Sequence, residues 1–292
     1  MSEYFQWNMD QEIVHFFGPF GLRWYSLLFL GGILTGYHFF AKMLVAEGKP
    51  VELRETLLYY VVLGTVIGAR LGHCLFYDPA YYFSEPLRIL KVWEGGLASH
   101  GGFTGVIIAV YLYSRKNKEA SFFWLVDRLA IWGILVGAFI RVGNFFNSEI
   151  IGRVTDVPWA VVFLKVDQMP RHPSQLYEAL GYGSICLLLY LLYRYWDRKP
   201  LEGRLLGLAF CIAYAFRFLV ETLKENQVGY EDQMLFNMGQ LLSLPFILLG
   251  IVLVIGWQKN IPALGWAFTQ EGQGQNQTGA PVKKRKKKRK TS

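Results

Sequence analysis

The chain has 292 residues, of which 53% are hydrophobic and 16% aromatic, and its formal net charge is +8. The apolar residues occur in long blocks rather than at amphipathic spacing, which excludes a soluble globular domain and indicates a membrane protein. Three cysteines, Cys74, Cys186 and Cys211, lie inside these blocks and show no zinc-ligand spacing. Neither a disulfide framework nor a bound metal or cofactor is therefore expected.

The apolar blocks predict an all-α, polytopic membrane protein with about seven transmembrane helices. A helix needs about 20 residues to cross the roughly 30 Å of hydrocarbon in a bilayer. Blocks of about that length occur at residues 20–44, 55–77, 97–114, 122–146, 175–196, 204–224 and 239–257. Together they make residues 1–260 a transmembrane domain.

Basic residues near the ends of the blocks predict the orientation, because lysine and arginine are enriched at cytoplasmic ends. The first nineteen residues contain neither, whereas Lys49, Arg115 and Arg198 lie in the loops after the first, third and fifth spans. We therefore expect the N-terminus outside and the C-terminus in the cytoplasm. No basic signal-peptide region precedes the first span, so that span is expected to direct insertion.

Three of the segments outside the predicted spans carry further expectations. Residues 79–93 are aromatic, mixed in charge and too short to span, and we expect them in the outer interface. Residues 147–174 are expected to form a small external cap, with a short strand or hairpin within 159–166. Residues 261–292 have the composition of a disordered basic cytoplasmic tail. Its basic run, 283–290, would attract anionic lipid headgroups or reinforce cytoplasmic placement; nucleic-acid binding is the competing interpretation and is not expected.

Ionisable residues inside the spans mark a candidate functional site. Each costs about 2.5–3.5 kcal/mol near the bilayer centre on insertion scales, so each needs a reason to be there. With the orientation above, five spans place polar side chains at the outer end: Tyr25, Arg70, His100, Arg141, Asn144, Arg217 and Glu221. This shared depth predicts a polar site that opens toward the outer leaflet. Arg23 lies at the same level, where an arginine can also act only as a headgroup anchor.

The residue types in this set favour a phosphate ligand. Several arginines at one depth suit a phosphate group, which in a membrane belongs to a phospholipid. Arg217 and Glu221 are at helical i, i+4 spacing and are expected to pair, either to orient the guanidinium or for a purely structural reason. His100, in a glycine-rich segment, suits a base near neutral pH or a satisfied histidine in a packed turn. Ser174 is the expected N-cap of the fifth span.

Six motifs along the chain resemble those of one family. They are "GLRWYSLLF" (21–29), "GGLASHGGFTG" (95–105), "RVGNFFNSEIIGR" (141–153), "RHPSQLYEA" (171–179), "RFLVE" (217–221) and "NMGQLLSLP" (237–245). The third is similar to the signature of bacterial prolipoprotein diacylglyceryl transferases, and the six occur in family order. The resemblance covers nearly all of residues 20–258.

The resemblance implies an enzyme of the bacterial plasma (inner) membrane, with its active site toward the periplasmic, outer face. Such an enzyme transfers the sn-1,2-diacylglyceryl group of phosphatidylglycerol to the lipobox cysteine of a prolipoprotein signal peptide, forming a thioether and releasing glycerol phosphate. This is the first step of lipoprotein maturation. It implies no cofactor and no metal, and its partners are membrane lipids and the prolipoprotein.

Matching the motifs position by position identifies the expected site residues. The expected catalytic residues are Tyr25, His100, Arg141 and Arg217, and the expected substrate-binding residues are Arg141, Asn144, Glu149, Gly152 and Glu221. Arg70 is added to the second group from its depth in the second span. In this scheme His100 takes the thiol proton, with Tyr25 as an orienting group or alternative relay.

Two other classes of protein fit some of these features. A transporter or receptor also suits seven spans with buried charges, but transporters usually place substrates near the midplane between inverted repeats, and no repeat is evident. Another phospholipid-modifying enzyme could use the same arginines with a different acceptor. The chemical nature of the acceptor would separate that enzyme from a thiol-modifying one.

Overall fold

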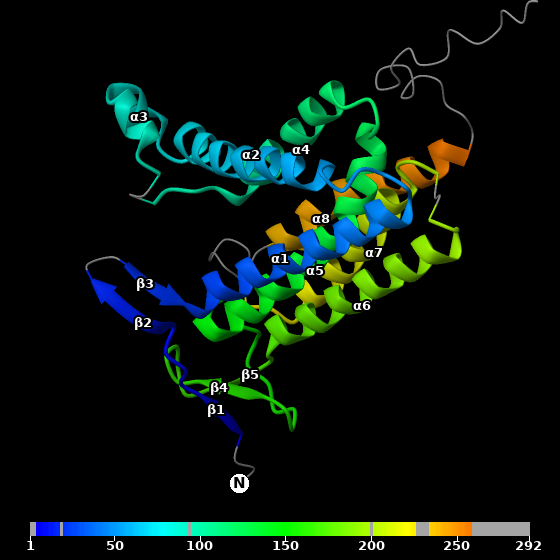
Figure 1. Ribbon diagram of the computed structural model, residues 1–292. Coiled ribbons are helices and arrows are strands. Elements are labelled where there is room, and N and C mark those ends of the chain that lie inside the picture. The colour runs from blue at the N-terminus through cyan, green and yellow to red at the C-terminus, as the bar shows by residue number, and fades with distance from the viewer. Residues whose placement is uncertain (1–3, 18–19, 93–94, 199–200, 226–233, 259–292) are drawn as a thin grey trace, which may run out of the picture. The chain divides into compact units, whose positions relative to one another are not determined.

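The structure is a computed structural model that describes residues 4–17, 20–92, 95–198, 201–225 and 234–258. By internal contacts the chain divides into two units, Met1–Asn260 and Ile261–Ser292. The first unit is mostly helical (Figure 1). The second unit, which includes the predicted basic tail, lies outside the described residues.

Each predicted span coincides with a helix. These helices are α1 (Trp24–Ala46), α2 (Leu53–Phe76), α4 (Ser99–Lys116), α5 (Phe122–Asn147), α6 (Ser174–Tyr195), α7 (Arg204–Glu221) and α8 (Met238–Gln258). Five of them, α1, α2, α5, α6 and α8, are long and apolar enough to cross a membrane. The chain is therefore a multi-pass membrane protein. The shorter α4 and α7 have 18 residues each, and the full count of seven spans stays a prediction.

Helix α5 occupies the centre of the helical unit. It contacts α1, α4, α6 and α7, and the surrounding core is built from aliphatic and aromatic side chains. Ile131 of α5, Leu189 of α6 and Leu205 of α7 are fully buried in this core. Trp132 of α5 stacks on Phe39 of α1 with ring centroids 5.0 Å apart. Polar side chains near the two ends of α5 are therefore held in fixed positions relative to its neighbours.

Helices α2 and α4 pack side by side as a close pair (Figure 1). Their contact is lined by Gly64, Gly68 and Gly72 of α2 and by Gly101 and Gly105 of α4. A Cβ atom on Gly68 would lie 2.8 Å from the Cα atom of Gly105, so only glycine permits the two backbones to approach this closely. The two helices are thereby fixed to one another along this contact.

Two short helices join α2 to α4 in the segment expected at the interface. They are α3 (Pro79–Ser84) and the 3-10 helix η1 (Pro86–Leu90). The side chains of Phe83, Leu87 and Leu90 are exposed, and large apolar side chains of this kind need lipid or another partner to cover them. Placement of this segment at the interface stays a prediction.

The prediction of an all-α fold is wrong, because the structure also contains two small β-sheets. Strands β1 (Phe5–Trp7), β4 (Val161–Phe163) and β5 (Pro170–Arg171) form a sheet in the order β1-β4-β5, in which β1 is parallel and β5 antiparallel to β4. Strands β2 (Glu12–Phe17) and β3 (Phe20–Arg23) form a hairpin that runs directly into α1. The strand expected within residues 159–166 is present as β4. None of the N-terminal strands was expected: β1 pairs with a distant segment and carries no local signal, and the β2–β3 hairpin was missed although its strands are adjacent in sequence.

A buried polar network lies near the N-terminal end of α5. Arg128 forms an ion pair with Glu47 at 2.9 Å; the arginine is buried, and the glutamate side chain is 9% exposed. The neighbouring Asp127 is fully buried and accepts hydrogen bonds from the backbone N–H groups of Gly203 and Leu206, each at 2.8 Å. Asp127 thus caps the start of α7 from a different helix, because the first N–H groups of a helix have no partner within it.

Replacing Asp127 with Ala should lower the free energy of unfolding by about 2 kcal/mol, because two buried N–H groups lose their acceptor. The measurement is equilibrium unfolding of the full chain in mixed detergent micelles. Ser184→Ala, which removes an exposed hydroxyl bonded only within α6, is the control and should change stability by less than about 0.5 kcal/mol. Equal stability of the two variants would contradict the capping role.

Candidate active site

The last two turns of α5 bring polar side chains into one chain of hydrogen bonds. Arg141 donates through Nη1 to Oδ1 of Asn144 at 3.2 Å, as their i, i+3 spacing on one helix face allows. Asn144 in turn donates to Oε1 of Glu149 at 2.6 Å, and Asn147 donates to the same oxygen at 3.2 Å. The structure therefore joins three of the expected site residues, Arg141, Asn144 and Glu149.

A strained turn carries Glu149 back toward the helix. Ser148 and Ile150 both have φ of 56°, in the left-handed region that costs a non-glycine residue on the order of 1–3 kcal/mol. Helix α6 holds this turn in place: Ser174 donates its hydroxyl to the carbonyl of Ile150 at 3.0 Å, and Gln175 donates to the carbonyl of Glu149 at 2.8 Å. The expected N-cap role of Ser174 is wrong, because its hydroxyl binds this turn and caps no helix.

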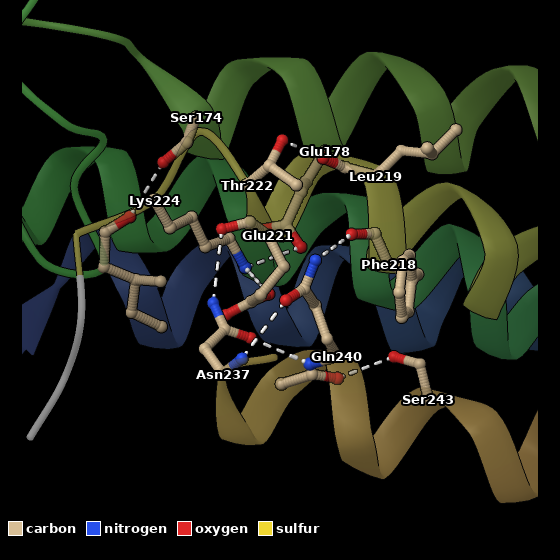
Figure 2. Close-up of polar contacts among 12 residues, drawn as sticks. Ser174, Glu178, Phe218, Leu219, Glu221, Thr222, Lys224, Asn237, Gln240 and Ser243 are labelled. Carbon is tan, nitrogen blue, oxygen red and sulfur yellow. Dashed lines mark hydrogen bonds and ion pairs between the residues drawn. The ribbon is translucent and has the colours of Figure 1, made fainter. Parts of the chain in front are cut away.

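Glu178 of α6 lies at the centre of a buried charge network. Its side chain is 0% exposed, and its Oε2 atom lies 3.1 Å from Nε of Arg141, an ion pair that lacks hydrogen-bond geometry. Its Oε1 atom accepts from Nζ of Lys224 at 3.0 Å and from the hydroxyl of Tyr182 at 3.3 Å. Lys224 also donates to Oε2 of Glu221 at 3.0 Å, as Figure 2 shows. Two cations and two carboxylates therefore balance one another.

The expected pair between Arg217 and Glu221 is not formed among the described residues. Glu221 pairs with Lys224 instead, because the chain turns after α7 and brings Lys224 back over the carboxylate. Within the part of the chain that the structure describes, the buried Nε atom of Arg217 has no hydrogen-bond partner.

Tyr25 and Gly152 both pack closely against this network. Tyr25 lies against Gly143 of α5, where an added Cβ would lie 3.3 Å from the Cα atom of Tyr25. Gly152 forms a backbone bridge with Lys224, and its N–H donates to the carbonyl of His172 at 3.1 Å. A Cβ on Gly152 would overlap His172, so the glycine is needed for close backbone packing rather than for a side-chain function.

Arg70 and His100 lie in a separate cluster, near the C-terminal end of α2 and the N-terminal end of α4. Arg70 is buried and donates to the carbonyls of four residues of the segment between α2 and α4: Arg88 and Ile89 of η1, and Gly95 and Gly96. His100 is exposed and contacts the rings of Phe76 and Tyr77, with centroids 5.4 and 5.9 Å away. In the described chain, no hydrogen bond, ion pair or ring contact joins either residue to the Arg141 network. Their expected roles in substrate binding and catalysis stay predictions.

Sequence reasoning missed two members of the network, Glu178 and Lys224. Glu178 is an ionisable residue inside the fifth predicted span, so the rule that selected Arg141 also applies to it. Lys224 follows Glu221 by three residues, but α7 ends at Glu221, so helical spacing does not account for their contact. Among the described residues, no three His, Cys, Asp or Glu side chains gather in a way that could hold a metal ion.

Arg171 of β5 connects the three-stranded sheet, in which β4 and β5 are neighbours, to this network. Its buried guanidinium donates to Asp167 at 2.6 Å, to Glu225 at 2.7 Å and to the carbonyl of Gly152 at 3.2 Å. The hydrogen bonds from Arg171 hold the pKa of the Asp167 carboxyl below its usual value. Since Gly152 is also bridged to Lys224, Arg171 links the sheet to the buried charges.

Apolar spanning helices around a buried charge network define a multi-pass membrane protein with a polar site at one end of its helices. A family model described as Prolipoprotein diacylglyceryl transferase matches residues 11–256. The phosphatidylglycerol–prolipoprotein diacylglyceryl transferase of Tolumonas auensis is 49% identical over 249 residues, covering 85% of this chain and 96% of that protein. Its namesake in Chloroherpeton thalassium is 45% identical over 253 residues, covering 87% and 94%. The chain belongs to the prolipoprotein diacylglyceryl transferase family, which confirms the resemblance.

Protonation of Asp167 should loosen the β4–β5 sheet at acid pH. Because its pKa in the folded state is depressed, its stabilising effect is present above the unfolded pKa of about 3.9 and is lost as pH falls through the folded value. Thermal unfolding should therefore distinguish the wild type from Asp167→Asn at pH 6, and the difference should shrink as the pH falls below about 4. A difference that stays constant with pH would show that the charge on Asp167 is not responsible.

Proposed function

We propose that this protein transfers the sn-1,2-diacylglyceryl group of phosphatidylglycerol to the lipobox cysteine thiol of prolipoproteins. The products are a thioether on the cysteine and glycerol phosphate, and the reaction is the first step of lipoprotein maturation. The observation that carries this proposal is the Arg141 network at one end of α5, in a chain that belongs to the family. An arginine fixed there suits the phosphate of an anionic phospholipid.

The proposed site faces the outer side of a bacterial plasma membrane. Arg128 and Arg141 are 13 positions apart on α5, about 20 Å along the helix axis, so the two polar networks lie at different depths. Lys49 and Arg198 lie in loops near the Arg128 end, and basic loops are cytoplasmic. The Arg141 end then faces outward. With α4 and α7 counted as spans, the N-terminus is outside and the C-terminus is in the cytoplasm.

The chemistry follows from the charges that develop during transfer. The thiol loses its proton to a base, and the thiolate sulfur forms a bond with the glyceryl carbon attached to the phosphate. The bond between that carbon and the phosphate oxygen breaks, and the oxygen keeps the electron pair. Arg141 and Arg217 stabilise the negative charge on the departing phosphate, in a region where burial strengthens electrostatic interactions.

The remaining residues hold the substrate or move the proton. Asn144 fixes Nη1 of Arg141, and the exposed carboxylate of Glu149 suits the hydroxyl groups of the glycerol headgroup. His100 serves as the base, and Tyr25, packed beside the Arg141 network, serves as an orienting group or alternative relay. Glu221 and Gly152 support the site through Lys224, and Arg70 shapes the loop before His100.

Arg141→Ala should abolish transfer while the protein still inserts and folds, because the departing phosphate loses its charge partner. The measurement is mass spectrometry of a lipobox peptide incubated with purified protein and phosphatidylglycerol. The wild type should add a diacylglyceryl mass to cysteine and release glycerol phosphate. Arg194→Ala, which removes an exposed arginine near the far end of α6, should keep wild-type turnover. Normal turnover by Arg141→Ala would remove Arg141 from the mechanism.

Deleting residues 270–292 should leave the rate of transfer largely unchanged, because every residue of the proposed site precedes position 260. The same mass-spectrometric assay on correctly inserted, truncated protein checks this. Complete loss of specific activity would show that the basic tail takes part in the reaction.

A further inference from the structure

We propose that Glu178 is the positioning residue of the site: its one carboxylate fixes the orientation of Arg141 and the place of Lys224. This inference deepens the proposed function and rests on it. Glu178 is not expected to touch either substrate. Its effect on the reaction passes through the two cations that it holds.

The placement of Glu178 suits this role. It lies on α6, between α5, which carries Arg141, and the segment after α7, which carries Lys224. Its Oε2 atom forms the ion pair with Arg141, without hydrogen-bond geometry, and its Oε1 atom accepts hydrogen bonds from Lys224 and the hydroxyl of Tyr182. Its side chain is 0% exposed, so water does not compete for these contacts.

The contact with Glu178 determines which edge of Arg141 remains available. Nε faces Glu178 and Nη1 faces Asn144, whereas no described residue accepts a hydrogen bond from Nη2. A guanidinium has five N–H donors in one plane, and two adjacent donors can bind two phosphate oxygens at once. With Nε facing Glu178 in the ion pair and one donor of Nη1 bonded to Asn144, the edge that includes Nη2 remains for a ligand. The side chain is itself only 14% exposed, so it has little freedom to turn.

The contact with Lys224 carries the same restraint to α7. Lys224 joins Glu178 to Glu221, the last residue of α7, with 3.0 Å contacts to each. Its backbone is held as well, by the bridge to Gly152 and by a 2.9 Å hydrogen bond from Arg153 to its carbonyl. Arg217 lies one helical turn before Glu221. Glu178 therefore ties the helix that carries Arg217 to the side chain of Arg141.

A simpler role for Glu178 would be to neutralise the buried Lys224. A buried cation without a partner is strongly destabilising, so this role alone would explain a carboxylate at position 178. The two roles differ when both charges are removed together. A neutralising role ends when Lys224 is replaced, whereas the orientation of Arg141 still requires the carboxylate.

The test measures kcat and KM for phosphatidylglycerol in detergent-purified full-length variants. Glu178→Gln keeps the size of the side chain and removes its charge. We expect kcat to fall about 100-fold with KM changed by less than about threefold, because misplacing a group that acts on the transition state can cost that much. Glu178→Asp keeps the charge but withdraws the carboxylate by one methylene, and should lower kcat about tenfold. Wild-type kcat in either variant would overturn the proposal.

The double variant Glu178→Gln with Lys224→Met separates orientation from neutralisation. It keeps the buried charges balanced, so it carries the test if Glu178→Gln alone does not fold. Continued loss of kcat supports the proposal, and recovery to the wild-type value would overturn it. Glu47→Gln is the matched control: it neutralises another carboxylate that pairs with an arginine of α5, and should leave kcat unchanged. Absence of transfer in the wild type would instead refute the proposed function.

Discussion

The buried carboxylate of Glu178, held between Arg141 and Lys224, is the contact on which the site depends. Placing charges in a membrane is costly unless each has a partner, and here one carboxylate serves two cations from different parts of the chain. The surrounding architecture keeps these groups together. Helix α5 is central, α6 supplies Glu178 and the residues that hold the strained turn, and the end of α7 returns Lys224 to the same region.

The two networks of α5 divide structural and chemical tasks between its ends. Near the start, Asp127 and Arg128 are fully paired with groups from neighbouring segments and hold the helices together. Near the C-terminal end of α5, Arg141 has N–H donors and Glu149 has carboxylate acceptors that are not all hydrogen-bonded to described residues. Both ends contain buried charges, so burial alone does not identify a site. The useful criterion is whether hydrogen-bonding capacity remains free for a ligand.

The sequence predicts the helices of this fold well and its charge pairs less well. Seven apolar blocks coincide with helices because hydrophobic length is a local property. The Arg141 motif marks the site because an ionisable residue inside a span is costly and therefore needs a reason to be there. The partner of Glu221 could not be predicted from i, i+4 spacing, since the chain leaves the helix before Lys224. Strand β1 was missed for a similar reason: its pairing with β4 joins segments far apart in sequence.

The support that α6 gives to the turn at Ser148–Ile150 has a consequence for biosynthesis. This turn has left-handed backbone angles at two non-glycine residues, and its stabilising hydrogen bonds come from Ser174 and Gln175. In a chain emerging from the ribosome, Arg141 appears first. Ser174 and Gln175, which bond the turn, appear at the start of α6, and Lys224 appears last. Insertion of α5 therefore precedes assembly of the site, and a nascent chain halted before α6 holds Arg141 in the membrane without Glu178.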